Sequence, residues 1–140
     1  MTEEIDIETI VIDPQAMNIV NRVAAGCRQS GVFHWQGGLM VEGRIEGEID
    51  IVGGPLVLMP EGVIAGRISG DGEAYLFGTI APRCANEPSE LEVAGEAFLT
   101  QSLRARANIK AGAIRSYLGA QVEGRVDTVA RKEDGKRAQP

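Results

Sequence analysis

A short repeated pattern in the middle of the chain constrains the fold more than any other feature. Five-residue segments with apolar ends and a central glycine occur as VEGRI (41–45), IEGEI (45–49), IAGRI (64–68), LFGTI (76–80) and VEGRV (122–126). Two degenerate copies, IAPRC (80–84) and LTQSL (99–103), complete the series. A recurrence of this kind is typical of architectures in which similar units stack on one another.

The spacing within each copy predicts a strand, and the spacing between copies predicts a solenoid. Apolar and polar residues alternate, so the apolar side chains point to one face of a strand. Copies that begin at Ile45, Ile64, Ile80, Leu99 and Val122 are separated by 19, 16, 19 and 23 residues. These steps match the coils of a β-helix, and the central glycine predicts a bend at a coil corner. We therefore expect an all-β chain with a parallel β-helix of about five to six coils over residues 37–127.

Two columns of apolar side chains should stack inside these coils. The first is expected to contain Ile45, Ile64, Ile80, Leu99 and Val122, and the second Ile49, Ile68, Cys84, Leu103 and Val126. One coil cannot bury its apolar face alone, so stacking supplies the stability. The outermost coils keep unpaired strand edges, which must be capped or must join another molecule.

The segment before the repeats has a different pattern. Residues 1–36 form an acidic leader in which Asp13-Pro14 is a helix-start signal. The recurrence of Ile19, Val23 and Cys27 every four residues predicts a helix over 14–29. We expect this helix to cover the first coil.

The aromatic run Phe33-His34-Trp35 should complete this N-terminal cap. At the other end, residues 128–140 are polar and charged, which predicts a disordered tail. Because such a tail cannot cover the last coil, that coil is the expected assembly interface. Its apolar residues are Tyr117, Leu118, Val122, Val126 and Val129.

Composition and motifs argue against an enzyme. The net charge of −6 disfavours nucleic acid as a partner. His34 is the single histidine, and the chain contains no P-loop, HExxH, EF-hand or Gly-x-Ser-x-Gly pattern. We therefore expect no catalytic residues, no metal, no cofactor and no nucleotide. Acids such as Glu46 and Glu92 fall at the outward positions of the strands, where solvated charges are expected.

Cysteine usage and the first residues bear on the cellular compartment. Cys27 and Cys84 are far apart and lack metal-type spacing, so we expect reduced, mostly buried thiols. The acidic start has no basic or apolar region of a signal peptide, and no apolar run reaches the length of a membrane span. A soluble protein of the cytoplasm is the expectation.

The strings VEGRIEGEI (41–49) and VEGRV (122–126) closely resemble the bactofilin family of bacterial cytoskeletal proteins. The resemblance covers about residues 37–127. It implies a right-handed parallel β-helix that polymerises end to end without nucleotide and has no catalytic site. It further implies roles in cell shape, stalks or division, with partners at the inner face of the membrane or at the cell wall. The acidic leader departs from the short, poorly ordered tail usual in the family.

Two alternatives remain open from the sequence. One is a β-helical binding or adhesion module that does not polymerise. The other is a left-handed β-helix acyltransferase built on hexapeptides. Ile45, Ile51, Val57 and Val63 do fall six residues apart, but Ser69 and Ala81 break that column.

Overall fold

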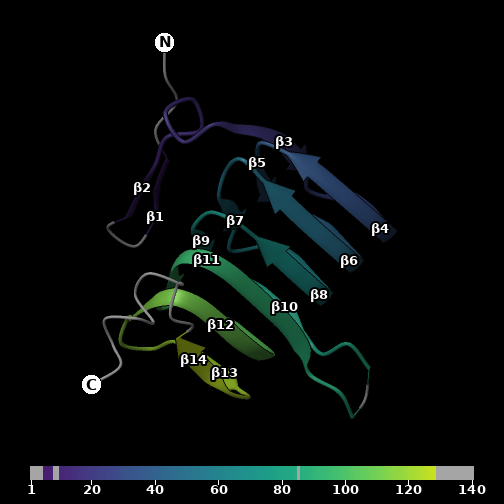
Figure 1. The fold of residues 1–140 in the computed structure, drawn as a ribbon, viewed down its shortest axis with the longest axis vertical. Helices are drawn as coiled ribbons and strands as arrows, with labels where there is room; N and C mark the ends of the chain where they lie inside the picture. Colours follow the sequence, from purple (N-terminus) through teal and green to yellow (C-terminus); the bar gives the residue numbers. More distant parts are fainter. Residues whose placement is uncertain (1–4, 8–9, 85, 129–140) are drawn as a thin grey trace, which may run out of the picture.

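The described part of the chain is a parallel β-solenoid of about six turns, which confirms the all-β prediction (Figure 1). The computed structural model describes residues 5–7, 10–84 and 86–128. Within these residues every regular element is a strand. The strands of neighbouring turns pair in parallel along the whole solenoid, and those of the first and last turns have a described partner on one side only.

In the first three turns of the stack, a short strand is followed by a long one. The strands of the solenoid are β3 (Ile19–Val23), β4 (Arg28–Gln36), β5 (Gly38–Val41), β6 (Arg44–Val52), β7 (Leu56–Leu58), β8 (Val63–Gly70), β9 (Ala74–Leu76), β10 (Thr79–Ala81), β11 (Ser89–Leu99), β12 (Arg104–Ser116), β13 (Gln121–Glu123) and β14 (Val126–Thr128). Before them, β1 (Ile5–Ile7) and β2 (Ile10–Ile12) form an antiparallel hairpin.

Three faces run along the stack. The first face contains β3, β5, β7, β9 and the C-terminal parts of β11 and β12. The second and third faces lie before and after the bend in β4, β6 and β8. In the fourth turn the bend is opened by an outward loop, residues 82–88, so that β10 lies on the second face and the start of β11 on the third.

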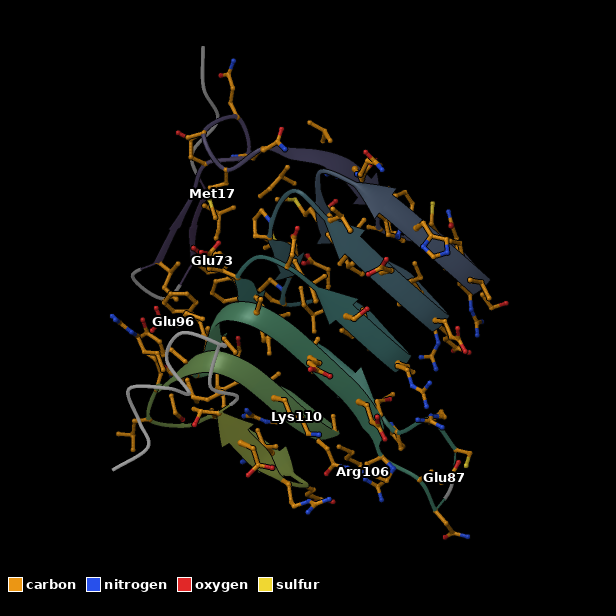
Figure 2. The ribbon with its side chains drawn as sticks, viewed as in Figure 1. Met17, Glu73, Glu87, Glu96, Arg106 and Lys110 are labelled. Atoms are coloured by element: carbon orange, nitrogen blue, oxygen red, sulfur yellow. The ribbon has the colours of Figure 1, made fainter. Side chains whose placement is uncertain are left out.

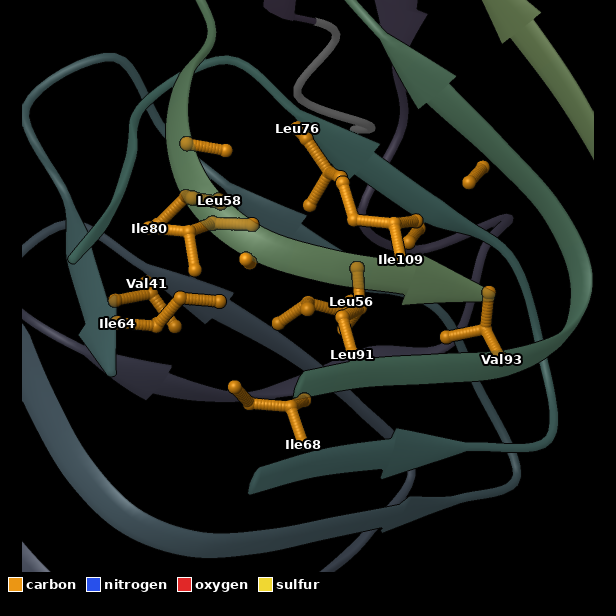
Figure 3. Packing of buried hydrophobic residues seen from close by; sticks show 14 of the residues in the cluster. Val41, Leu56, Leu58, Ile64, Ile68, Leu76, Ile80, Leu91, Val93 and Ile109 are labelled. Carbon is orange, nitrogen blue, oxygen red and sulfur yellow. The ribbon is translucent and has the colours of Figure 1, made fainter. Parts of the chain in front are cut away.

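The inner columns are confirmed at seven of their ten predicted positions and differ at the other three. Register pairs place Ile45, Ile64, Ile80, Ala105 and Val122 in the first column. The second column contains Phe33, Ile49, Ile68, Leu91, Ile109 and Val126. The predicted positions of Leu99, Cys84 and Leu103 were therefore wrong. Figure 3 shows members of both columns pointing into one enclosed core.

The outward loop is the physical reason for these errors. Because the chain leaves the stack at this corner, Cys84 lies exposed in the loop and Leu91 takes the inner position. Ser89 closes the loop: its buried hydroxyl accepts a hydrogen bond from the Gly66 N–H at 2.8 Å and donates to the Ala81 carbonyl. Leu99 stacks instead with Leu76 on the first face.

Glycine is required where the long strands bend. Gly47 and Gly66 have φ values of +126° and +115°, in the left-handed region that side chains rarely adopt. A Cβ atom on Gly47 would lie 1.9 Å from the carbonyl oxygen of Gly31 in the turn before it. The central glycine of the repeat therefore marks a coil corner, as its position predicts.

The predicted helix over 14–29 is wrong. Residues Ile19 and Val23 lie in β3, and the segment from Arg28 onward is β4. A spacing of four residues also keeps side chains on one face of a strand, because the strand period is two, and pairing with β5 and β6 decides between the two structures. The Asp13-Pro14 signal yields one turn, closed by hydrogen bonds from Met17 N to Asp13 O (2.9 Å) and from Ile19 N to Pro14 O (2.8 Å).

Two other expectations concern the ends of the chain. The parallel stack begins at Ile19, ahead of residue 37. The expected tail lies outside the described residues, except that Thr128 ends β14. The part of the chain that the structure describes has no helix able to cross a membrane.

We expect Ile64→Asp to unfold the solenoid, because a charge without a partner in the core costs several kcal/mol, roughly the stability of a small domain. Ile64 is 1% exposed and lies between Ile45 and Ile80. Circular dichroism and thermal melting measure the loss. Glu92→Gln, at an exposed position of β11, is the control and should change the stability by less than about 0.5 kcal/mol. An unchanged melting temperature for Ile64→Asp would contradict the inner column.

A second pair of substitutions tests the corner. Gly31 has φ +140°, and a Cβ atom there would meet nothing within 4 Å, whereas on Gly47 it would overlap a backbone carbonyl. Gly31→Ala should cost about 1–3 kcal/mol from backbone strain alone. Gly47→Ala should cost clearly more, as measured by urea unfolding of both variants. Equal losses would show that the close approach of the turns does not require glycine.

Candidate functional site

The described residues offer little for catalysis or for binding a metal. Within residues 5–7, 10–84 and 86–128 there is no group of three or more His, Cys, Asp or Glu side chains that could hold a metal ion. His34 lies on the outer surface of β4, with its Nδ1 atom 3.5 Å from a carboxylate oxygen of Asp50. This pair is exposed, so it lacks the enclosure that an acid–base site needs.

A groove of about 530 Å³ follows the glycine corner. Its floor is formed by Gly31, Gly47 and Gly66, and its walls carry both signs of charge. Arg44 and Glu46 form an ion pair within it. Since arginine and glutamate side chains both line the groove, it does not present a single-sign surface to a ligand.

The outward side of the third face is a ladder of alternating charges. Register pairs place Glu48 beside Arg67 and Arg67 beside Glu90. In the neighbouring column Lys110, labelled in Figure 2, lies between Glu92 and Asp127. Opposite charges on adjacent strands contribute roughly 0.2–1 kcal/mol per pair and disfavour a shifted register. These charges therefore serve the stack and its hydration.

The first turn leaves the edge of a long strand unpaired. Among the described strands β4 pairs only with β6, so one edge of its nine residues is open. Phe33 and Trp35 point inward and pack half-buried against the core, with their rings stacked at 5.9 Å. The Trp35 indole Nε1 is buried and has no hydrogen-bond partner among the described residues. His34 points outward, so it is separated from the two aromatic rings.

The last turn is also open within the described residues. β13 and β14 pair only with β12 among them. Val122 packs half-buried against the core, Val126 is 39% exposed, and Leu118 is 97% exposed. Tyr117 is half-buried at the bend after β12, and Val129 lies outside the described residues.

Exposed apolar side chains are concentrated at the two ends. The large hydrophobic residues exposed in the described part are Val20, Val32, Val52, Leu118 and Val126. Val20 and Val32 belong to the first turn, Leu118 and Val126 to the last, and Val52 alone lies between them. The sequence analysis did not identify the two valines of the first turn as exposed, and Val20 lies within the segment that was expected to be a helix.

The outward side of the first face is apolar, unlike that of the third. Register pairs align Met40, Val57, Tyr75, Phe98 and Arg115, which we call the outer column. The Tyr75 and Phe98 rings stack at 4.6 Å, and the Arg115 guanidinium lies 5.6 Å from the centre of the Phe98 ring. Arg115 also pairs with Glu96 at 2.9 Å.

The N-terminal hairpin covers part of the outer column. Ile12 is fully buried in a cluster with Met40, Met59, Val57 and Phe77. Ile10, Met17, Ile19 and Tyr75 pack against this cluster as half-buried residues. In Figure 1 the hairpin lies beside the stack, on the side of β7 and β9, and not over the edge of β4. The sequence did not reveal this second, outer core.

Both cysteines are exposed, which contradicts the expectation that they are mostly buried. Cys27 lies at the bend between β3 and β4. Cys84 lies in the outward loop, where its thiol contacts the Glu87 carboxylate at 3.3 Å; Figure 2 labels Glu87 in this loop. The bend and the loop that contain these two cysteines do not face the core, so apolar character alone does not bury a residue there.

Tyr75 provides a pH-dependent test of the outer column. Burial, and then the nearby carboxylates of Glu73 and Glu96, raise the pKa of Tyr75 above its ordinary value of 10.0. As the pH rises above 10.0, the unfolded chain therefore releases this proton before the folded chain does, and the free energy of unfolding falls. Tyr75→Phe should reduce this alkaline loss while keeping the ring stack. Parallel stability curves for the two proteins in alkaline urea titrations would contradict it.

Comparison with known proteins agrees with this geometry. The chain matches the model of the bactofilin family, described as "Polymer-forming cytoskeletal", over residues 21–127. No curated protein and no solved structure matches it significantly. The matched span runs from β3 into β14, which is nearly the whole stack. The chain therefore belongs to the bactofilin family of polymer-forming cytoskeletal proteins.

Proposed function

We propose that this protein is a structural scaffold whose copies join end to end through the open turns of their solenoids. The observation that carries the proposal is the placement of exposed apolar residues beside unpaired strand edges in the first and last turns. Such an edge offers its free N–H and C=O groups to another chain. The polymer-forming character of the family supports the same function.

The last turn is the proposed principal joint. Its apolar residues are Tyr117, Leu118, Val122 and Val126, with Val129 as a further candidate outside the described residues. At the first turn, Phe33 and Trp35 fill the lumen and act as a cap, while His34 remains at its outer rim. A joint between two last turns would be isologous, so each residue would meet the same surface of its partner.

Assembly is proposed to need no nucleotide and to serve no catalysis. The sequence contains no phosphate-cradling motif, and the family is a structural one. We place the polymer in the cytoplasm, peripherally at the inner face of the membrane, where it would support cell shape, the envelope or the division machinery. Membrane-associated or cell-wall proteins would then be its partners besides itself.

A pair of valines tests the joint. We expect Val126→Arg to leave the monomer folded and to abolish assembly, because both copies would bring a charge to one small apolar contact. Val52→Arg is the matched control, since Val52 is 47% exposed and Val126 39%, but Val52 lies in the second turn. Analytical ultracentrifugation and electron microscopy measure polymer length. The proposal fails if both variants assemble as wild type, or if both lose assembly equally.

A further inference from the structure

The N-terminal hairpin is attached to the solenoid by side chains and not by strand pairing. In the part of the chain that the structure describes, β1 pairs only with β2, and the two form a sheet separate from the solenoid. A two-stranded hairpin is marginally stable at best on its own in water. Its position therefore depends on the apolar contacts that Ile12 and its neighbours make with the outer column.

The surface beneath the hairpin is a well-formed apolar seat. Met40, Val57 and Phe77 are 5%, 0% and 0% exposed under it. If the hairpin moved away, these side chains would form a contiguous apolar patch along the first face, next to the stacked rings of Tyr75 and Phe98. Patches of this kind on a soluble protein mark interaction sites.

A short turn over residues 13–17 connects the hairpin to the stack, and Asn18 fixes it at the end that joins the stack. Asn18 is held by the stack: its side chain donates to the Gly53 carbonyl at 2.8 Å, and its own carbonyl accepts from Gly38 N at 2.7 Å. Asn18 also has φ 59°, in the left-handed region. On the hairpin side only the single turn over residues 13–17 intervenes. Opening that turn would redirect the hairpin without disturbing β3.

We propose that the outer column is a lateral docking surface for the hairpin of a second copy of this chain. The hairpin of another copy fits this surface, because it would make the same contacts that this hairpin makes in its own chain. Each copy carries one hairpin and one seat, so reciprocal exchange leaves neither exposed. When copies are held side by side, the high local concentration of hairpins favours this exchange. This contact concerns the sides of the stack and does not depend on the joint at its ends.

Complementation between two full-length variants tests the exchange. Ile12→Lys disables the hairpin and keeps the seat, whereas Val57→Lys disables the seat and keeps the hairpin. Both residues belong to the outer cluster, so the inner core remains intact in each variant. Mixed in equal amounts, the two variants can pair an intact hairpin with an intact seat only across chains. Sedimentation of each variant alone and of the mixture is the measurement, with circular dichroism to verify folding.

We expect the mixture to contain a species with twice the mass of the units that either variant forms alone. End-to-end assembly contributes equally to the three samples, so it cannot produce this difference. Val52→Lys, which leaves hairpin and seat intact, should sediment as wild type. The pair Ile10→Lys and Met40→Lys repeats the test if either first variant fails to fold. The exchange is ruled out if the mixture sediments as the sum of its parts, or if the hairpin-disabled variant associates equally well alone.

Discussion

Parallel hydrogen bonding between successive turns is the interaction on which the rest of this structure depends. β6 pairs with β4 over nine residues and with β8 over eight, so its backbone groups are satisfied from both sides. The same register aligns Ile45 with Ile64 and Ile49 with Ile68 inside the stack. A shift by one residue would turn these side chains to the outside, so backbone pairing and core burial specify each other. Among the described turns, only the first and the last lack a second neighbour, and this makes the ends chemically different from the middle.

The same stacking distance restricts what the corners can contain. Adjacent turns approach so closely at the bend that a Cβ atom on Gly66 would lie 2.1 Å from the Gly47 carbonyl. Extra residues can therefore enter only by leaving the stack, as residues 82–88 do. The buried Ser89 hydroxyl then bonds groups in two adjacent turns, Gly66 N–H and the Ala81 carbonyl. The inserted loop is tolerated because it projects outward and because the Ser89 hydroxyl supplies hydrogen bonds to the backbone groups that the loop leaves unpaired.

The sequence was sufficient where the repeat is regular and insufficient where other contacts decide the structure. The glycine corners and the pairs Ile45–Ile64 and Ile49–Ile68 follow from alternation and spacing. Beyond the loop, apolar residues of two different faces look alike in sequence, so Leu99 was assigned to the column that contains Ala105. Ile19 and Val23 suit one face of a helix or of a strand, and only pairing with β5 distinguishes them. The hairpin seat was missed because Met40 and Val57 lie within continuous apolar runs whose outward members look like core residues.

The three faces differ in ways that direct association. On the third face, opposite charges such as Glu92, Lys110 and Asp127 lie at neighbouring register positions, and desolvating them would cost free energy. On the first face, the hairpin covers the part of the outer column that contains Met40 and Val57, so this part is closed unless the hairpin moves. At the ends, the free N–H and C=O groups of the outermost strands have no strand beside them within the described turns. Another backbone or water must therefore supply their hydrogen bonds. The open strand edges therefore favour the proposed contact along the axis, whereas the proposed contact between sides requires the hairpin to leave the outer column of its own chain.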